Sequence, residues 1–435
     1  MDKTQKWQCF AALGGSALLY ALWRWRKGQR DPFGFDTPVD RRGFKTVKYD
    51  LSPILFGEAA RDCLQHWVAD MDLPCCSQLR KKFAARMAHP IYGYTIQPEC
   101  VWSAVGQWLV ENQNWPKAPE PECFVFSGTV LASVGSILRT FAQPRDKVLT
   151  MVPLYPPLQK VVTASGCILV QYDLPVKVEG GVSRYEMDVE ALKKVLDKEN
   201  VKFIILCSPH NPVGRVWTRE ELVALAGACR DRGILVIVDE VWADWCWKPF
   251  TPFHPVATDM GCKCISLGSP TKTWNLAGFH CSYAIFDDKA MLKSFKEYVQ
   301  PQFLDHGSTF GTEALQIAYE SKEWMYAVRA YVKANFTYLA ECLKDIPGIK
   351  LAHHEATYLA WLDCSGLGLP KDKVHSWMIQ AGLLLSPGSD FHKDYGHFQR
   401  MNLACSRQKL GEALARLKLA VQNISHDVGL KNGPN

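Results

Sequence analysis

The feature that most constrains this chain is a series of short, almost continuously apolar runs separated by segments of helical periodicity. The runs lie at Cys123–Phe126, Lys147–Val152, Lys202–Cys207, Ile234–Asp239, Cys264–Leu267 and Cys281–Phe286. Apolar runs without alternation are typical of strands buried on both faces, and strands separated by helices usually pair in parallel. The sequence therefore predicts an α/β fold whose large domain contains a mostly parallel sheet covered by helices.

The length of 435 residues is too great for one small core, and composition divides it further. We expect an N-terminal hydrophobic anchor or targeting segment (1–30), an arm and linker rich in Pro, Gly and charge (31–70), a large domain (71–305) and a smaller α+β domain opened by a long helix (306–435). The smaller domain should contain strands near Tyr358–Leu362 and Arg400–Ala404 and a last helix at Gln408–Asn423. In the large domain, Thr218-x-x-Glu221 is a capping box that predicts a helix through Arg230.

Charge is distributed unevenly along the chain. Lys and Arg number 50 against 44 Asp and Glu, which gives a net charge of +6, and residues 1–30 carry +5 of it. The nearly neutral remainder lacks the basic surface on which nucleic-acid binding depends, so no nucleic-acid partner is expected. The 16 cysteines are scattered without spacing typical of a zinc site, and we expect reduced thiols and no metal.

The N-terminal segment contains an uncharged run, Trp7 to Trp23, between Lys6 and Arg24. As a helix this run would span about 25 Å, against a hydrocarbon layer of about 30 Å. Interfacial aromatic residues, and basic residues where a cleavage site would stand, favour an uncleaved transmembrane anchor over a signal peptide. A mitochondrial transit peptide and a helix docked on the body are the alternatives.

The side of the membrane on which the body lies follows from the same charges. The larger positive charge follows the apolar run, and the positive-inside tendency then leaves the body in the cytosol. We therefore expect a membrane-anchored protein with a cytosol-facing body. A mitochondrial or a soluble cytoplasmic protein is the alternative.

The most informative stretch for chemistry is Ser269-Pro270-Thr271-Lys272-Thr273, which follows a predicted buried strand. Burial lowers the pKa of a lysine amine and makes it a nucleophile able to form Schiff bases. Two other predicted strands also lead to polar residues at their carboxyl ends. Ile234–Asp239 ends in the carboxylate of Asp239, and Lys202–Cys207 is followed by the turn 208–214, which contains Asn211. Polar residues at the carboxyl ends of parallel strands face the crevice where α/β proteins bind ligands.

A lysine, an aspartate and an asparagine at neighbouring strand ends suit pyridoxal 5′-phosphate (PLP). The lysine takes the aldehyde, the aspartate keeps the pyridine nitrogen protonated, and the asparagine donates to the ring oxygen. The sequence thus predicts a PLP site around Lys272, Asp239 and Asn211.

Several motifs together resemble a known family. SPHNPVG, VDE, SPTKTWNLAG and FQRMNLACSR are similar to fold-type I PLP enzymes of the class I/II aminotransferase superfamily. WVADMD (67–72), YGYT (92–95), VPLYPP (152–157) and TYLAWLD (357–363) resemble, more narrowly, the MalY/PatB-type carbon–sulfur β-lyases. The resemblance runs from about residue 35 to 425 and implies the fold-type I architecture, PLP as cofactor, an amino-acid substrate and a homodimer.

The resemblance also implies roles for individual residues. Lys272 is expected to be the catalytic lysine that binds PLP and moves protons, Asp239 the partner of the pyridinium, and Asn211 the donor to the phenolate oxygen. Arg400 matches the arginine that binds the substrate α-carboxylate through a bidentate fork. The remaining cofactor contacts that it implies are the stacking ring of Tyr155, the turn Ser127-Gly128-Thr129-Val130 and the hydroxyl of Ser269 at the phosphate, and Tyr94 reaching the phosphate of the neighbouring subunit.

Two positions depart from the family pattern. Trp242, expected against the cofactor, stands three residues after Asp239, where relatives commonly carry Tyr or His. An indole donates a hydrogen bond but cannot exchange a proton as a tyrosine can. His280 stands eight residues after Lys272, where many aminotransferases place a phosphate-binding arginine. Trp245 and Trp247 nearby either line the entrance or cover the core.

The motifs leave the reaction open. In a β-lyase acting on cysteine S-conjugates or cystathionine, the leaving group departs from Cβ, and the products are a thiol, pyruvate and ammonia. In an aminotransferase, Lys272 returns the proton to the cofactor and a 2-oxo acid accepts the amine. The catalytic residues are nearly the same for both, so the lyase is the first hypothesis and the aminotransferase the alternative. A binding protein that has lost catalysis is disfavoured by the complete set of Lys272, Asp239, Asn211 and Arg400.

Overall fold

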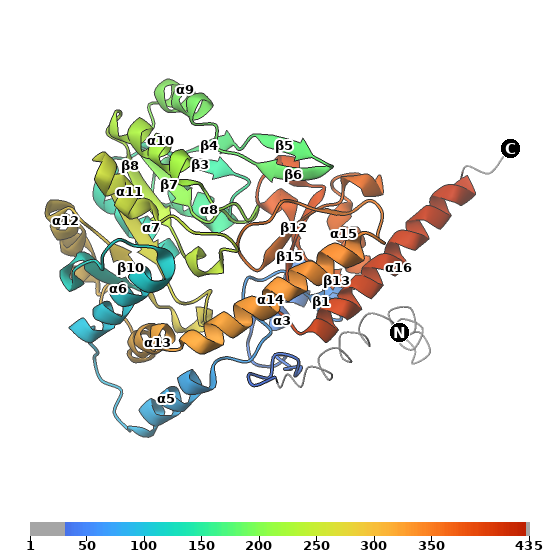
Figure 1. Ribbon diagram of the computed structural model, residues 1–435, viewed down its shortest axis with the longest axis horizontal. Coiled ribbons are helices and arrows are strands. Elements are labelled where there is room, and N and C mark those ends of the chain that lie inside the picture. Colours follow the sequence, from blue (N-terminus) through green and yellow to red (C-terminus); the bar gives the residue numbers. More distant parts are fainter. Residues whose placement is uncertain (1–30, 432–435) are drawn as a thin grey trace. The chain divides into compact units, whose positions relative to one another are not determined.

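The computed structural model describes residues 31–431. The described chain forms two compact units (Figure 1). The large unit comprises residues 75–326 and 353–357, and the small unit comprises residues 31–74, 327–352 and 358–431.

The large unit is built on a seven-stranded sheet in the order β2-β10-β9-β8-β7-β3-β4. Its strands are β2 (Phe124–Ser127), β3 (Lys147–Val152), β4 (Ile168–Asp173), β7 (Phe203–Cys207), β8 (Leu235–Asp239), β9 (Cys264–Gly268) and β10 (Ser282–Ile285). Strand β10 is antiparallel to both of its neighbours, and the pairs from β9 through β4 are parallel. A separate hairpin consists of β5 (Val176–Glu179) and β6 (Val182–Tyr185). This mostly parallel sheet with helices confirms the predicted α/β class.

Helices surround the sheet of the large unit. They are α5 (Ser77–Ala88), α6 (Glu99–Gln113), α7 (Val130–Phe141), α8 (Pro156–Ala164), α9 (Val189–Glu199), α10 (Arg219–Arg230), α11 (Phe253–Met260), α12 (Lys289–Val299) and α13 (Thr309–Glu320). Side chains from α7, α8 and α12 share one core with strands β3, β7, β8 and β9. Every residue of β7 and β8 is buried, so both faces of these strands are covered and polar groups become accessible at the strand ends.

The small unit combines short sheets with long helices. It contains α3 (Val47–Asp50), α4 (Ser52–Phe56), α15 (Val374–Gln380) and α16 (Arg407–Lys431), together with the part of α14 (Lys322–Leu343) that follows residue 326. An antiparallel sheet has the order β11-β12-β15-β14, and β1 (Leu64–Gln65) pairs in parallel with β13 (Leu383–Leu384). The strands of the antiparallel sheet are β11 (Lys350–Leu351), β12 (Leu359–Asp363), β14 (Ser386–Pro387) and β15 (Phe398–Asn402).

The structure corrects the expectation of a transmembrane helix, membrane attachment and a membrane-anchored location. Among residues 31–431, no helix combines the length and the apolar character needed to cross a bilayer. The run to which the expectation referred, within residues 1–30, lies outside the described residues. As a helix, the uncharged run would be about 25 Å long, which is shorter than a hydrocarbon layer of about 30 Å.

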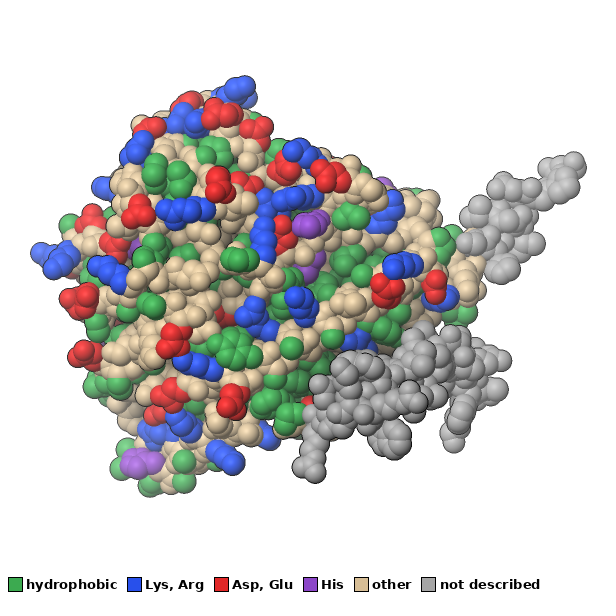
Figure 2. Space-filling model, in the orientation of Figure 1, with side chains coloured by type: hydrophobic (Ala, Val, Ile, Leu, Met, Phe, Trp, Pro, Cys, Tyr) green, Lys and Arg blue, Asp and Glu red, His purple; other side chains and the backbone are tan. Residues whose placement is uncertain are grey.

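Charged side chains of both signs are interspersed on the face that Figure 2 shows. Lys and Arg side chains alternate there with Asp and Glu side chains and with hydrophobic ones. Mixed surface charge of this kind is what the nearly neutral composition of residues 31–435 leads one to expect.

The predicted capping box at the start of α10 is confirmed. The Thr218 hydroxyl accepts from the Glu221 N–H at 3.2 Å, and the Glu221 carboxylate accepts from the Thr218 N–H at 2.7 Å. We expect Thr218→Ala to lower the free energy of unfolding by about 1 kcal/mol, because helix donors lose their acceptor. Urea unfolding followed by tryptophan fluorescence measures the change. The control is Thr337→Ala at an exposed position inside α14, and an equal loss there would contradict the capping explanation.

Candidate active site

The carboxyl ends of β7, β8 and β9 meet at one edge of the large sheet. Asp239, the last residue of β8, pairs in register with Cys207 of β7 and Leu267 of β9. The segment carrying Asn211 leaves the end of β7, and the segment carrying Lys272 leaves the end of β9. Parallel pairing therefore brings the three predicted cofactor residues to neighbouring strand ends.

Asp239 is a buried carboxylate, with 5% of its surface exposed. Its Oδ1 accepts a hydrogen bond from the Val241 N–H at 3.2 Å. Burial raises the pKa of Asp239 to about 6, although the nearby charge of Lys272 acts in the opposite direction. Because burial disfavours the ionised form of Asp239, a cationic partner such as a protonated ring nitrogen would stabilise this carboxylate.

Two tryptophan side chains lie close to Lys272. The Lys272 Nζ lies 6.0 Å from the ring centroid of Trp242, which is almost completely buried. The Trp245 Nε1–H donates to the backbone carbonyl of Lys272 at 3.2 Å, which fixes the main chain of the lysine. Trp245 is fully buried and therefore belongs to the core rather than to an exposed entrance. The sequence left this choice open, and an indole contact across 27 residues has no local signal.

The turn predicted to bind phosphate lies between β2 and α7. Thr129 is the N-cap of α7, and its hydroxyl accepts from the Ala132 N–H at 3.1 Å. Gly128 precedes this cap and Val130 is the first helical residue. The first amides of a helix carry unpaired donors and the positive end of the helix dipole, so this turn suits an anion.

Ser269 and His280 lie in two other segments near this turn. The buried hydroxyl of Ser269 donates to the Cys281 carbonyl at 2.6 Å and contacts the Thr271 hydroxyl at 2.8 Å. His280 is exposed and has a left-handed backbone, with φ of 51°. Together with Ser127 and Gly128 it lines a cavity of about 300 Å³. A histidine thus stands beside the phosphate turn where many aminotransferases carry an arginine.

Tyr155 and Asn211 are joined through the main chain. Tyr155 is the N-cap of α8, and its N–H donates to the Asn211 carbonyl at 3.2 Å. Asn211 is buried, and the Tyr155 ring is half-buried against the core. Their predicted contacts, with the ring oxygen and the ring face, remain predictions.

Tyr94 differs from the other predicted cofactor residues because its side chain is completely exposed. It lies between α5 and α6, where Ile91, Tyr92 and Ile96 are also exposed, and Met87 near the end of α5 is exposed as well. Its predicted contact with the phosphate of a neighbouring subunit remains a prediction.

Arg400 lies on β15 of the small unit, with 5% of its surface exposed. Its Nη2 donates to the Trp67 carbonyl at 3.0 Å and to the Ser386 hydroxyl at 3.2 Å. Its guanidinium carbon lies 4.8 Å from the ring centroid of Phe391. Sequence reasoning missed Ser386 and Phe391, because neither belongs to a motif near Arg400 in the chain.

Comparison with known proteins shows which family and which relatives this chain resembles. Residues 69–417 match the family described as aminotransferase class I and II. The chain is 31% identical to cystathionine beta-lyase PatB of Bacillus subtilis, covering 89% of this chain and 99% of PatB, and 27% identical to protein MalY of Escherichia coli, covering 90% and 100%. It also resembles the PLP-bound C–S lyase of Staphylococcus hominis, with a TM-score of 0.81, 27% identity and coverage of 89% and 97%.

The residues of this chain fit PLP. Lys272 offers an amine and Asp239 a buried carboxylate at adjacent strand ends, and the first turn of α7 offers amides to an anion. This combination supplies a partner for the aldehyde, for the ring nitrogen and for the phosphate of the cofactor.

The pKa of Asp239 makes PLP binding by the apoprotein dependent on pH. An acid with a pKa of about 6 is ionised at about pH 7.5 and mostly protonated at about pH 5.5, where the ionised fraction is about fourfold lower. We expect the dissociation constant for PLP, measured by equilibrium dialysis, to rise by about that factor between the two values. Asp239→Asn should bind weakly at both and lose the dependence, while Asp231→Asn, at an exposed carboxylate, should retain it. An unchanged pH dependence in Asp239→Asn would assign the titration to another group.

Proposed function

Because this chain belongs to the aminotransferase class I and II family, we propose that it is a PLP-dependent carbon–sulfur β-lyase. Its substrates are cysteine S-conjugates or cystathionine, which it cleaves to a thiol, pyruvate and ammonia. The observation that carries the proposal is full-length similarity to carbon–sulfur lyases, since PatB is named a cystathionine beta-lyase and the Staphylococcus hominis protein a C–S lyase.

The large unit holds the cofactor. When bound, PLP supplies a ring that withdraws electrons from the substrate Cα. The Nζ of Lys272 would hold the aldehyde carbon, and the Asp239 carboxylate would keep a proton on the ring nitrogen. The Asn211 amide would donate to the ring oxygen, and Tyr155 and Trp242 would lie beside the ring. The phosphate would be bound by Gly128, Thr129, Val130 and Ser269. Tyr94 reaches the phosphate of a second subunit in a homodimer.

The substrate is bound and deprotonated by two residues of this chain. Arg400 forks onto the α-carboxylate through two parallel N–H···O bonds, which sets the orientation of Cα. The Nζ amine of Lys272 would take the Cα proton. The Cβ–S bond then breaks with its electron pair on sulfur, and the thiolate leaves and is protonated. The overall reaction consumes one water for each conjugate and yields one thiol, one pyruvate and one ammonium ion.

Trp242 cannot exchange a proton with the ring oxygen of the cofactor. Its indole N–H donates but cannot accept a proton from the ring oxygen, as a tyrosinate could. Proton movement at Cα is therefore left to Lys272, whose Nζ lies on the face of the Trp242 ring.

A product assay distinguishes the lyase from the aminotransferase. We expect the PLP-loaded protein to release thiol and pyruvate in equal amounts from S-methyl-L-cysteine or cystathionine without a 2-oxo acid, because elimination needs no amine acceptor. Thiol is measured with a chromogenic disulfide and pyruvate by coupled reduction. Turnover that requires an added 2-oxo acid would contradict the lyase and support the aminotransferase.

Lys272→Ala should abolish both turnover and the visible absorbance band of bound PLP, because the covalent link and the proton carrier are lost together. Lys263→Ala changes an exposed lysine just before β9 and should leave both unchanged. Turnover retained by Lys272→Ala would refute the assignment.

A further inference from the structure

The segment from His66 to Met71 is irregular in backbone, yet every one of its carbonyls accepts a hydrogen bond from elsewhere in the small unit. The donors are the Asn402 N–H to His66 at 2.8 Å, Arg400 Nη2 to Trp67 at 3.0 Å, Asn402 Nδ2 to Val68 at 2.7 Å, the Tyr358 hydroxyl to Ala69 at 2.9 Å, Lys48 Nζ to Asp70 at 3.1 Å and Arg41 Nη1 to Met71 at 3.3 Å. A segment outside sheets and helices that is bonded this completely has one backbone geometry.

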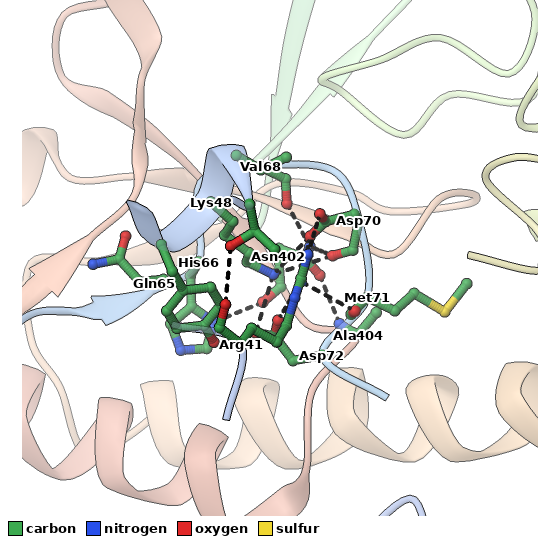
Figure 3. A network of polar contacts seen from close by, with 12 residues as sticks. Arg41, Lys48, Gln65, His66, Val68, Asp70, Met71, Asp72, Asn402 and Ala404 are labelled. Atoms are coloured by element: carbon green, nitrogen blue, oxygen red, sulfur yellow. Dashed lines mark hydrogen bonds and ion pairs between the residues drawn. The ribbon is translucent and has the colours of Figure 1, made fainter. Parts of the chain in front are cut away.

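Two buried and three half-buried charged side chains contact one another around this segment, and Figure 3 labels four of them, namely Arg41, Lys48, Asp70 and Asp72. We call Arg41, Lys48, Asp70, Asp72 and Lys409 the charge cluster. Asp72 accepts from Arg41 at 2.7 Å, Lys48 at 3.0 Å and Lys409 at 2.6 Å. Asp70 accepts from Arg41 at 2.7 Å and lies 3.3 Å from Lys48.

The charge cluster carries a net charge of +1, since three cations surround two carboxylates. Lys48 is 1% exposed and Asp72 is 8% exposed. Burial by itself would raise the pKa of Asp72, but the charges of Lys48 and Lys409 outweigh it and hold that pKa well below its usual range. The carboxylates therefore stay ionised, and the cluster persists across the physiological pH range.

Lys48 connects the charge cluster to Trp67 and so to Arg400. The Lys48 carbonyl accepts from Trp67 Nε1 at 3.0 Å, and its Nζ donates to the Asp70 carbonyl at 3.1 Å. One residue thus holds the side chain of Trp67 and the main chain three residues later. The Trp67 carbonyl between these two points accepts from Arg400 Nη2.

We propose that Lys48 is a positioning residue: its ammonium group holds the main chain at Asp70 and so fixes the Trp67 carbonyl that orients the Arg400 guanidinium for the substrate carboxylate. The proposal rests on the proposed function, in which Arg400 binds that carboxylate. The Trp67 carbonyl and the Ser386 hydroxyl fix Nη2, and the Phe391 ring packs against the guanidinium face. A bidentate fork works only when its plane is fixed, and a displacement of about 1 Å is enough to weaken such a contact severely.

The charges of this cluster are suited to positioning. Buried ion pairs add little net stability compared with apolar packing, because desolvation offsets most of their attraction. They do define distances and directions among several chain segments at once. In addition, the net charge of +1 favours an anion at Arg400 over a neutral group.

The test compares S-methyl-L-cysteine with its methyl ester, which lacks the carboxylate. The ratio of kcat/KM for the acid to kcat/KM for the ester measures how much the contact between Arg400 and the substrate carboxylate contributes to turnover. We expect Lys48→Met to lower this ratio about tenfold, mainly through KM, and to weaken binding of L-alanine, followed through cofactor absorbance, by a similar factor. PLP content should stay unchanged. Lys82→Met, at the exposed pair with Glu320, should change nothing.

Lys48→Met should fold, because two cations and two carboxylates remain and the cluster becomes neutral. Trp67→Phe provides a second variant that keeps every charge and removes the indole bond to Lys48, and it should lower the ratio in the same direction. In the background of Arg400→Lys, Lys48→Met should lower the ratio no further, because both act through one contact.

The outcomes separate the two claims. If wild-type protein and Arg400→Lys show the same acid preference, the role of Arg400 fails and this proposal fails with it. If Arg400→Lys lowers the preference while Lys48→Met and Trp67→Phe leave it intact, this proposal alone is overturned. It is also overturned if Lys48→Met lowers the ratio equally in the wild-type and Arg400→Lys backgrounds.

Discussion

The structure of the large unit depends on the in-register parallel pairing of β7, β8 and β9. Every residue of β7 and β8 is buried, and in these two strands Asp239, at the carboxyl end of β8, is the one charged residue. Parallel strands end at the same edge, and the register pairs Asp239 with Cys207 and Leu267. The three predicted cofactor residues lie at this edge, because Asp239 ends β8 while Asn211 and Lys272 follow β7 and β9.

In the small unit, side chains rather than a regular sheet fix the position of the functional segment. The segment from His66 to Met71 has no ladder of its own, and its carbonyls are held by side chains of Arg41, Lys48, Tyr358, Arg400 and Asn402 together with one main-chain donor. In the large unit the regular sheet positions the polar groups, whereas here buried charges position an irregular backbone. Each arrangement suits the ligand proposed for it, since a flat aromatic cofactor needs a rigid edge and a carboxylate needs an oriented guanidinium.

The positions of the proposed cofactor residues at the strand ends could be predicted because the sequence signal for each strand is local. The run Lys147–Val152 is a strand with those bounds, Asp239 ends the apolar strand β8, and Lys272 follows the end of β9 by four residues. The charge cluster could not be predicted in the same way. Lys48 and Lys409 are far apart in the chain, and charges in a segment rich in Pro and Gly are ordinarily solvated. Strand β15 begins two residues before the predicted strand, and the antiparallel insertion of β10 between β2 and β9 depends on long-range pairing.

The central claim is that Lys272, at the end of β9, is the residue that carries PLP. Borohydride reduction of the PLP-loaded protein fixes the cofactor to the lysine that holds it, and mass spectrometry of the digested protein then locates the adduct. We predict one phosphopyridoxyl group per chain, on the peptide that contains Lys272. An adduct on another lysine, or none in protein saturated with PLP, would contradict the account.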